Sequence, residues 1–365
     1  MWKEKKNRWI LVRCLIVTVI FALLLVFAGK LFIPYYIQDT DQNRTFYKTE
    51  KNTVDVLIAG SSTLLVGLSP LELWEDYGIV AHTRASTVQA PPVTWLNIKE
   101  AYRYQKPEVV VMGITSLFLD YDYDANEPYL RRGLDFKRLS ADKLKAVNEI
   151  VKRSGSQHML DYIFPIFRYH DRWKEFQWTD VYNLQYRHDF MRGQYPVYRA
   201  KKIKARDHVD KNVPPEKENT DSWSFYQDII EYCQSQGSEV VVVNMPDNRW
   251  TYGRYQTAKE LTEGCGAAYI DLNLEEPLKE MKIDWEYDFY DPHHLNPVGA
   301  QKATKYLGDY LVENYDIPQN QCGEGTAELL NEDLKKYKVK LKEFKDKLET
   351  VSYTHLRAHE TRRHG

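Results

Sequence analysis

Short apolar runs alternate with helix-like segments along most of the chain. Five runs predict strands: residues 54–59, 79–82, 108–113, 239–244 and 267–272. The runs at 108–113 and 239–244 contain consecutive valines with no alternating polar residues. Such runs indicate strands buried on both faces, as in a parallel sheet covered by helices.

The segments between these runs have the spacing of amphipathic helices. We expect helices near residues 70–77, 93–105, 224–237, 255–266 and 296–315. Gly237 fits a helix C-terminus, and Pro297 fits the start of the last helix. The alternation of strand and helix predicts an α/β fold, namely a right-handed, three-layer α/β/α sandwich around a parallel sheet.

The N-terminal region carries the strongest hydrophobic signal. Residues 9–34 are mostly apolar, and their only charged residues are Arg13 and Lys30 near the two ends. Because about 20 residues span a bilayer, this segment predicts a transmembrane anchor. The basic residues at positions 1–8 place the N-terminus in the cytoplasm and the following domain outside the cell membrane. The alternative is a cleaved signal peptide, but the segment is long and lacks a small-residue cleavage site.

The rest of the chain divides by composition. Residues 35–53 are polar and predict a tether, followed by an α/β domain at residues 54–318. Residues 120–221 break the strand–helix rhythm and are expected to form an insertion over the carboxyl ends of the strands, where open α/β sheets place their sites. Within this insertion, the charged residues 204–221 predict an exposed loop.

The C-terminal region is helical in pattern and highly charged. Residues 319–350 predict a helix with an apolar stripe that fits docking on the domain or pairing with a partner helix. The stripe consists of Leu334, Tyr337, Leu341, Phe344 and Leu348. Residues 351–365 match no pattern in the rest of the chain and resemble the translation of a sequencing adapter, so we expect a non-native tail.

Composition and charge narrow the classes of function. The chain is 43% hydrophobic, and its formal net charge of -2 leaves no basic surplus for nucleic acid. Cys233, Cys265 and Cys322 are expected outside the membrane, where disulfides are permitted, but the sequence selects no pair. There is no Cys-x-x-Cys spacing for structural zinc, and we expect no metal or cofactor.

The first strand ends in the sequence Ala-Gly-Ser-Ser at residues 59–62. A serine after Gly60, where the chain turns into a helix, has an exposed hydroxyl close to unpaired backbone N–H groups. Such N–H groups can stabilise an oxyanion, so Ser62 is a candidate nucleophile. The alternative is that Ser61 or Ser62 only caps the helix.

A second polar cluster, at residues 290–301, favours the catalytic interpretation. Asp291 and His294 lie three residues apart, just before the last predicted helix. In a tight turn the carboxylate can orient the imidazole toward a serine, as a serine nucleophile requires. The two signals together predict a Ser-His-Asp triad.

These two stretches resemble the SGNH (GDSL-like) hydrolase superfamily, and in particular its membrane-anchored branch of DltD-like proteins and polysaccharide O-acetyltransferases. The resemblance covers residues 54–315. The Gly-Ser-Ser sequence is similar to the first family block, with Ser62 at the nucleophile position. The sequence at 291–300 is similar to the last block, Asp-x-x-His-Leu-Asn-x-x-Gly. By this resemblance, Gly60 belongs to the oxyanion and substrate-binding region.

The two middle family blocks are matched less well. The region 83–92 has no glycine where the family supplies an oxyanion donor, so Ser86 or a neighbouring backbone N–H is the candidate replacement. Thr115 stands where the family has asparagine. Fewer donors favour slow acyl transfer over fast hydrolysis, because one such donor is worth about 2.7–4 kcal/mol.

Within the insertion, His170 and Arg172 lie beside Trp173. This group fits the binding of an anionic or sugar substrate. It fits equally well the internal packing of the insertion, with Asp171 paired to an arginine.

Two classes of function therefore remain. The first is a membrane-anchored extracytoplasmic serine esterase or O-acyltransferase that acts on a cell-envelope polymer. By the resemblance, a membrane-bound O-acyltransferase is its expected partner. The second is a non-catalytic polymer-binding or scaffold protein of an envelope-modification or export complex. A flavodoxin-like binder would need a phosphate-binding glycine loop, which the sequence lacks.

Overall fold

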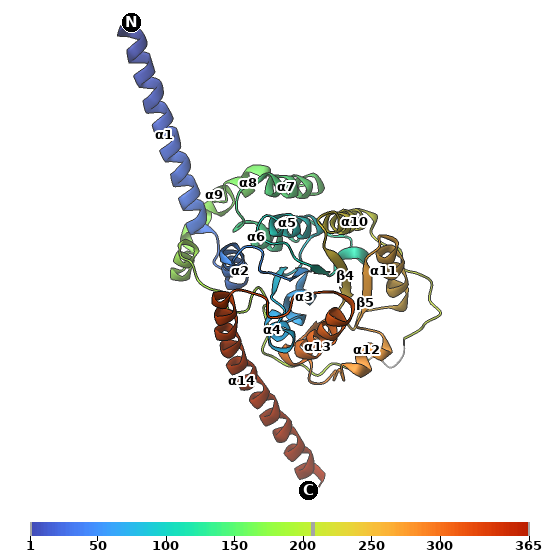
Figure 1. The fold of residues 1–365 in the computed structure, drawn as a ribbon. Helices are drawn as coiled ribbons and strands as arrows, with labels where there is room; N and C mark the ends of the chain where they lie inside the picture. The colour runs from blue at the N-terminus through green and yellow to red at the C-terminus, as the bar shows by residue number, and fades with distance from the viewer. Residues whose placement is uncertain (1, 206–208, 364–365) are drawn as a thin grey trace.

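The computed structural model describes residues 2–205 and 209–363 and is built around one parallel sheet (Figure 1). The sheet has five strands in the order β2-β1-β3-β4-β5, and every neighbouring pair is parallel. The strands are β1 (Val56–Gly60), β2 (Ala81–Ala85), β3 (Val109–Met112), β4 (Glu239–Asn244) and β5 (Ala268–Asp271). The predicted α/β class and the parallel sheet are confirmed.

Helices cover both faces of this sheet, as the unbroken apolar runs predicted. One face packs on α3 (Ser62–Gly67), α4 (Pro70–Tyr77), α12 (Glu275–Glu280) and α13 (Pro297–Asn314). The other face packs on α5 (Pro91–Ala101), α10 (Thr220–Ser235) and α11 (Tyr252–Gly264). These layers fit an α/β/α sandwich.

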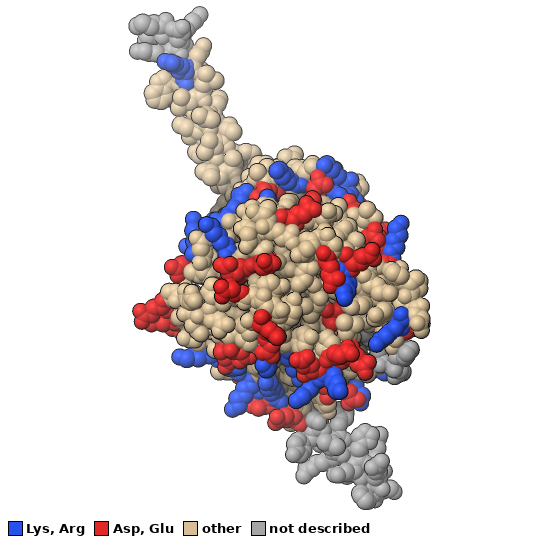
Figure 2. All heavy atoms as spheres, turned by 45° about the vertical axis from the view of Figure 1, so that its right-hand side comes forward, with Lys and Arg blue, Asp and Glu red and all other residues tan. Residues whose placement is uncertain are grey.

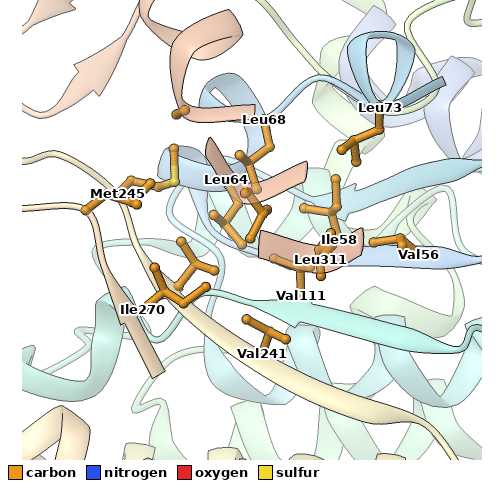
Figure 3. Packing of buried hydrophobic residues seen from close by; sticks show 14 of the residues in the cluster. Val56, Ile58, Leu64, Leu68, Leu73, Val111, Val241, Met245, Ile270 and Leu311 are labelled. Atoms are coloured by element: carbon orange, nitrogen blue, oxygen red, sulfur yellow. The ribbon is translucent and has the colours of Figure 1, made fainter. Parts of the chain in front are cut away.

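Neighbouring residues of one strand belong to different cores. Ile58 and Val111 lie in the cluster on the α13 face (Figure 3), whereas Leu57 and Val110 lie in the cluster on the α5 face. All four side chains are fully buried. This is the expected result of side-chain alternation in a strand that is covered on both sides.

The helices of the insertion do not lie over the carboxyl ends of the strands, unlike the sequence-based expectation, whereas Val197 near the end of the insertion packs beside Ala85, the last residue of β2. Helices α6 (Glu127–Leu134) and α7 (Ala141–Arg153) pack on the outer side of α5 and add a further layer there (Figure 1). The physical reason is the burial of apolar side chains. Leu130, Leu134 and Ile150 bury against Val93 and Leu96 of α5.

The insertion continues as short helical turns up to Leu184, and residues 195–203 then pass beside α3 and β6 (Phe289–Asp291), where the amides of Tyr195 and Lys201 donate to the carbonyls of Leu65 and Phe289. The turns are α8 (Met159–Ile163), α9 (Ile166–Tyr169) and two 3-10 helices, η2 (His170–Lys174) and η3 (Trp178–Leu184); a third 3-10 helix, η1 (Thr115–Phe118), follows β3. The expected exposed loop at 204–221 lies partly at residues 206–208, outside the described residues. Its other end is already helical, since α10 begins at Thr220.

The expected tether at residues 35–53 is largely a packed helix, α2 (Ile37–Lys48). Most of its polar residues are buried, and partners from distant segments satisfy two of them. Asn43 accepts hydrogen bonds from Arg84 at 2.7 Å and from Lys137 at 3.2 Å. Asp39 forms an ion pair with Arg132 at 2.8 Å. The chain is therefore held firmly to the domain soon after the N-terminal helix.

Long helices stand at both ends of the chain (Figure 1). Helix α1 (Trp2–Phe32) contains a 26-residue apolar segment, Asn7–Phe32, long enough to cross a membrane. In Figure 2 this helix projects from a domain whose visible face carries interspersed acidic and basic side chains. All four cysteines are free thiols.

At the C-terminal end, α14 (Glu324–Arg363) docks on the domain. Tyr337 and Leu341 of the predicted stripe are buried against Leu71 and Trp74 of α4. The helix continues through the backbone of residues 351–363, and residues 364–365 of the predicted non-native tail lie outside the described residues.

Candidate active site

Ser62 lies at the junction between strand β1, which pairs with β2 and β3, and helix α3. The strand ends at Gly60, and Ser62 is the first residue of α3. A Cβ atom at Gly60 would lie 3.2 Å from both the Gly113 amide nitrogen and the Leu64 side chain. Gly60 is therefore a close-packing position that lets the chain turn at the end of the strand.

The structure brings the three predicted triad residues into one chain of hydrogen bonds. Ser62 Oγ lies 2.8 Å from His294 Nε2, although the two residues are 232 positions apart. His294 Nδ1 lies 2.9 Å from both carboxylate oxygens of Asp291. The imidazole thus connects the hydroxyl to the carboxylate, which is the order required for a serine nucleophile, its base and the group that orients the base.

A small antiparallel hairpin holds Asp291 and His294 in place. They belong to β6 (Phe289–Asp291) and β7 (His294–Leu295), which pair directly at these two residues. Asn296 follows and caps α13, since its side-chain oxygen accepts from the amides of Val298 and Gly299. The same carboxamide donates back to the Tyr287 carbonyl, so one buried asparagine joins the hairpin to the helix.

The structure shows why the motif has a glycine at position 299. A Cβ atom at residue 299 would lie 2.4 Å from the Asp288 carbonyl oxygen. Helix α13 therefore approaches the hairpin more closely than any side chain would allow.

The rings of Tyr290 and His293 lie next to the ring of His294. The Tyr290 ring stacks on the His294 ring at 5.4 Å between centroids, with an interplanar angle of 8°. Burial and the nearby Asp291 charge raise the pKa of the Tyr290 hydroxyl to about 12. On the other side, His293 Nδ1 lies 2.9 Å from Asp247 Oδ1. Burial alone would raise the pKa of Asp247, but hydrogen bonds from Arg249 and His293 outweigh it and lower the value.

Ser61 occupies the N-cap position of α3 but does not cap the helix through its side chain. Its hydroxyl accepts a hydrogen bond from the Gln89 amide at 3.2 Å. Ser61 therefore fastens the loop between β2 and α5 beside the nucleophile. Helix capping does not account for the hydroxyl of either serine.

Ser86 lies in this same loop, close to the site but engaged elsewhere. It is buried, and its hydroxyl donates to Gln89 Oε1 at 2.9 Å. Gln89 Oε1 also accepts from Asn97, and Gln89 Nε2 donates to Thr94. Gln89 thus organises the loop between β2 and α5. No sequence pattern indicates this role, which depends on contacts formed only in the folded loop.

Val88, next to Gln89, has a left-handed backbone conformation with φ of +49°. This conformation is unusual for a β-branched residue and carries strain. The Tyr121 hydroxyl holds it by donating to the Val88 carbonyl at 2.8 Å.

Thr115 contacts the residue that follows the nucleophile. Its hydroxyl is 3.1 Å from the hydroxyl of Thr63, the residue that follows Ser62. This contact joins η1 to α3 and engages the side chain that stands at the asparagine position of the resembled family.

His170 and Arg172 lie elsewhere, at the end of α1. Arg172 donates to the Phe32 carbonyl at 2.9 Å and to Asp180 at 2.8 Å. His170 is exposed, and its Nδ1 lies 2.9 Å from the Phe167 carbonyl. The contacts of both side chains belong to the insertion and the N-terminal helix, and none involves the triad. The alternative that these residues serve internal packing therefore describes Arg172 better.

Among residues 2–205 and 209–363, no group of three or more His, Cys, Asp or Glu side chains is arranged to hold a metal ion. A comparison with protein-family models and a search of curated proteins found no match for this chain. The interpretation of the site therefore depends on its geometry and chemistry.

Proposed function

We propose that this chain is a membrane-anchored extracytoplasmic serine esterase or O-acyltransferase that acts on a cell-envelope polysaccharide or a related polymer. The observation that carries the proposal is the hydrogen-bonded chain from Ser62 through His294 to Asp291. Serine is a weak nucleophile without an adjacent base, and this arrangement supplies both the base and its orienting carboxylate.

The first half-reaction forms an acyl-enzyme. Ser62 Oγ attacks the carbonyl carbon of an acyl donor while His294 Nε2 takes the hydroxyl proton. Asp291 accepts the hydrogen bond from His294 Nδ1 and stabilises the imidazolium. The amides of Leu64 and Leu65 already donate to the Ser61 carbonyl, so the amides of Ser62 and Thr63 at the start of α3 are the proposed backbone donors for the tetrahedral oxyanion. The donor's leaving group then departs with the proton from His294.

The second half-reaction passes the acyl group to an acceptor hydroxyl. His294 removes a proton from a sugar hydroxyl or from water, whose oxygen attacks the acyl-serine carbonyl. The intermediate collapses with release of Ser62, which recovers its proton from His294. A sugar acceptor gives O-acyl transfer, and water gives hydrolysis.

The N-terminal helix supports the membrane assignment. Its apolar segment is long enough to span a bilayer, and basic residues precede it. That order favours a cytoplasmic N-terminus and an external domain. Together with the resemblance to membrane-anchored SGNH proteins, this makes an envelope polymer the proposed acceptor. A membrane-bound O-acyltransferase is the proposed source of acyl groups.

A specific observation favours the non-catalytic alternative of a polymer-binding scaffold. The hydroxyls of Ser86 and Thr115, the two candidate side-chain donors for an oxyanion, are engaged with Gln89 and Thr63. With both hydroxyls engaged, the oxyanion site has fewer donors and stabilises the tetrahedral intermediate less, which fits a protein that binds a polymer without modifying it.

Labelling with a fluorophosphonate probe separates the two functions. The wild type should be labelled and Ser62→Ala should not, because the probe reacts with an activated serine. Ser61→Ala is the matched control, since it removes the neighbouring hydroxyl, which contacts Gln89, and should still be labelled. Absence of labelling in the folded wild type, or equal labelling of wild type and Ser62→Ala, would favour the scaffold.

A further inference from the structure

The insertion carries three exposed aromatic side chains beside the end of α1. Trp178 is 85% exposed, Trp173 is 62% exposed and Phe167 is 47% exposed. They come from three consecutive elements, α9, η2 and η3, and we call these three residues the aromatic patch. Three large exposed rings on consecutive elements exceed the single exposed apolar residues that are normal for a surface, and they point to an interaction surface.

Each of these elements is attached to the short stretch where α1 ends. Gly29 of α1 lies against Pro165 and Ile166, since a Cβ atom at Gly29 would be 3.5 Å from both. Arg172 of η2 donates to the Phe32 carbonyl. In η3, Asn183 donates to the Ile33 carbonyl at 2.6 Å. Figure 1 shows α9 beside the domain end of α1.

The length of α1 sets the depth of this attachment in a bilayer. The 26 residues of Asn7–Phe32 rise by about 39 Å at about 1.5 Å per residue, more than the roughly 30 Å of a hydrocarbon core. The end of the helix therefore reaches into the headgroup layer. Gly29 lies only about 4.5 Å before Phe32 along the axis, so α9 lies close to the boundary between headgroups and acyl chains.

We propose that the aromatic patch is a membrane-contact surface that seats the domain on the headgroup layer of the outer leaflet. Tryptophan and other aromatic rings favour this layer because they combine an apolar body with polarity or a quadrupole. Lys174, whose ammonium lies 5.5 Å from the Trp173 ring centroid, would face lipid phosphates beside it. The elements that carry the patch contact the end of α1, so the bilayer that α1 crosses is the occupant we propose for it.

Contact of the patch with the headgroups would fix the orientation of the domain relative to the membrane. One transmembrane helix on a flexible linker would leave this orientation free. Because α2 is packed on the domain, no flexible linker separates α1 from the domain. The contact of the patch with the headgroups would prevent the domain from rotating about the axis of α1. The inference depends on α1 crossing a bilayer, which is part of the proposed function, but it does not depend on the triad.

The test uses the full-length protein in phosphatidylcholine–phosphatidylglycerol vesicles whose acyl chains carry bromine near the headgroup end. Bromine quenches tryptophan on contact. The fluorescence emission of the double variant Trp173→Phe/Trp178→Phe is subtracted from that of the wild type. The difference is the emission of the two patch tryptophans. Trp223→Phe is the control, because Trp223 packs against the core on the α10 face.

We expect the isolated patch emission to lose most of its intensity in brominated vesicles and to resist the aqueous quencher acrylamide. The Trp223 difference emission should be insensitive to bromine. The reverse pattern, with patch emission quenched by acrylamide and not by bromine, would overturn the proposal and leave the patch to water or a protein partner. Flotation of the vesicles provides a separate test of the anchor, because a protein that does not float contradicts the transmembrane assignment of α1 itself.

Discussion

Ser61 and Ser62 are adjacent in the chain, and their hydroxyl groups contact different parts of the site. Ser61 Oγ accepts from the Gln89 amide at 3.2 Å, whereas Ser62 Oγ lies 2.8 Å from His294 Nε2. The first contact fastens the loop after β2, and the second faces the imidazole. One hydroxyl is thus placed for structure and its neighbour for proton transfer.

Replacing the Asp291 carboxylate should make His294 a poor base without moving the imidazole ring. In Asp291→Asn one of the two accepting oxygens is replaced by an NH2 group. This group can donate to His294 Nδ1 and so favours the wrong tautomer of the imidazole. We expect the kcat for hydrolysis of an activated acetyl ester to fall by about 10⁴-fold, as for the corresponding change in a serine protease triad. The measurement is steady-state hydrolysis of p-nitrophenyl acetate by protein in detergent.

Asp247→Asn is the matched control for this change. Asp247 contacts His293, the neighbour of His294, at the same distance of 2.9 Å. We expect this variant to keep its activity within about tenfold, since His293 is outside the triad. Equal losses in the two variants would show that the second His–Asp pair is part of the catalytic unit, contrary to the assignment.

The strained loop beside Ser61 predicts a stabilising substitution. Val88 has φ of +49°, and glycine adopts this conformation without steric cost. Relief of about 1–3 kcal/mol of strain, less about 0.5–1 kcal/mol of glycine entropy, should raise the free energy of unfolding of Val88→Gly by about 1 kcal/mol. Denaturant titration in detergent measures this change.

Thr87→Gly tests whether the effect is specific to the conformation of Val88. Thr87 is adjacent and is not among the described residues with positive φ. Here glycine brings only its entropic cost, so we expect a loss of about 0.5–1 kcal/mol. A loss of stability in both variants would argue against strain at Val88.

The sheet and the triad pairing could be predicted because their signals are local. Consecutive valines mark a strand that is buried on both faces, wherever the helices come from. The serine after Gly60 and the Asp-x-x-His spacing each describe a turn at the end of an element. His294 belongs to the separate β6–β7 hairpin, which contacts α3, so the pairing of Ser62 with His294 across 232 positions was predicted from the two motifs together and not from the parallel sheet.

The features that could not be predicted depend on distant partners. The polar residues of α2 suggested a tether, because nothing near them in sequence shows that Arg84 and Lys137 will satisfy Asn43. The insertion was misplaced for a similar reason, since its apolar residues fit the outer side of α5 as well as any strand end. Gln89 had no signal at all, because its partners meet only after the loop has folded.

The glycine of the last motif should tolerate no side chain. In Gly299→Ala the new methyl group would lie 2.4 Å from the Asp288 carbonyl oxygen, so α13 must move away from the hairpin. We expect a loss of about 1–3 kcal/mol in stability, together with slower fluorophosphonate labelling, because the hairpin carries Asp291 and His294.

Gly264→Ala is the control for helix glycines in general. A Cβ atom there would meet nothing within 4 Å, so alanine should be neutral or stabilise by about 0.5–1 kcal/mol. Gly299→Ala with unchanged stability would show that the close approach of α13 to Asp288 is not required.

Asp55, just before β1, should make stability depend on pH. Its carboxylate accepts from the Val80 amide at 2.8 Å, yet burial raises its pKa from 3.8 to about 6, and the charge of Glu108 adds to the rise. Because the folded state holds this proton more tightly than the unfolded state, the contribution of Asp55 is fully present below about pH 4. It is lost as the pH rises through 6.

Asp55→Asn isolates this contribution, since asparagine keeps an oxygen for the Val80 amide and cannot ionise. The difference in unfolding temperature between wild type and Asp55→Asn should shift in favour of the variant between pH 4 and pH 6 and stay constant above pH 7. Thermal unfolding in detergent across this range measures it. A difference that is flat from pH 4 to pH 6 would mean that Asp55 ionises equally easily in the folded and unfolded chains, and that water reaches its carboxylate despite the neighbouring strand.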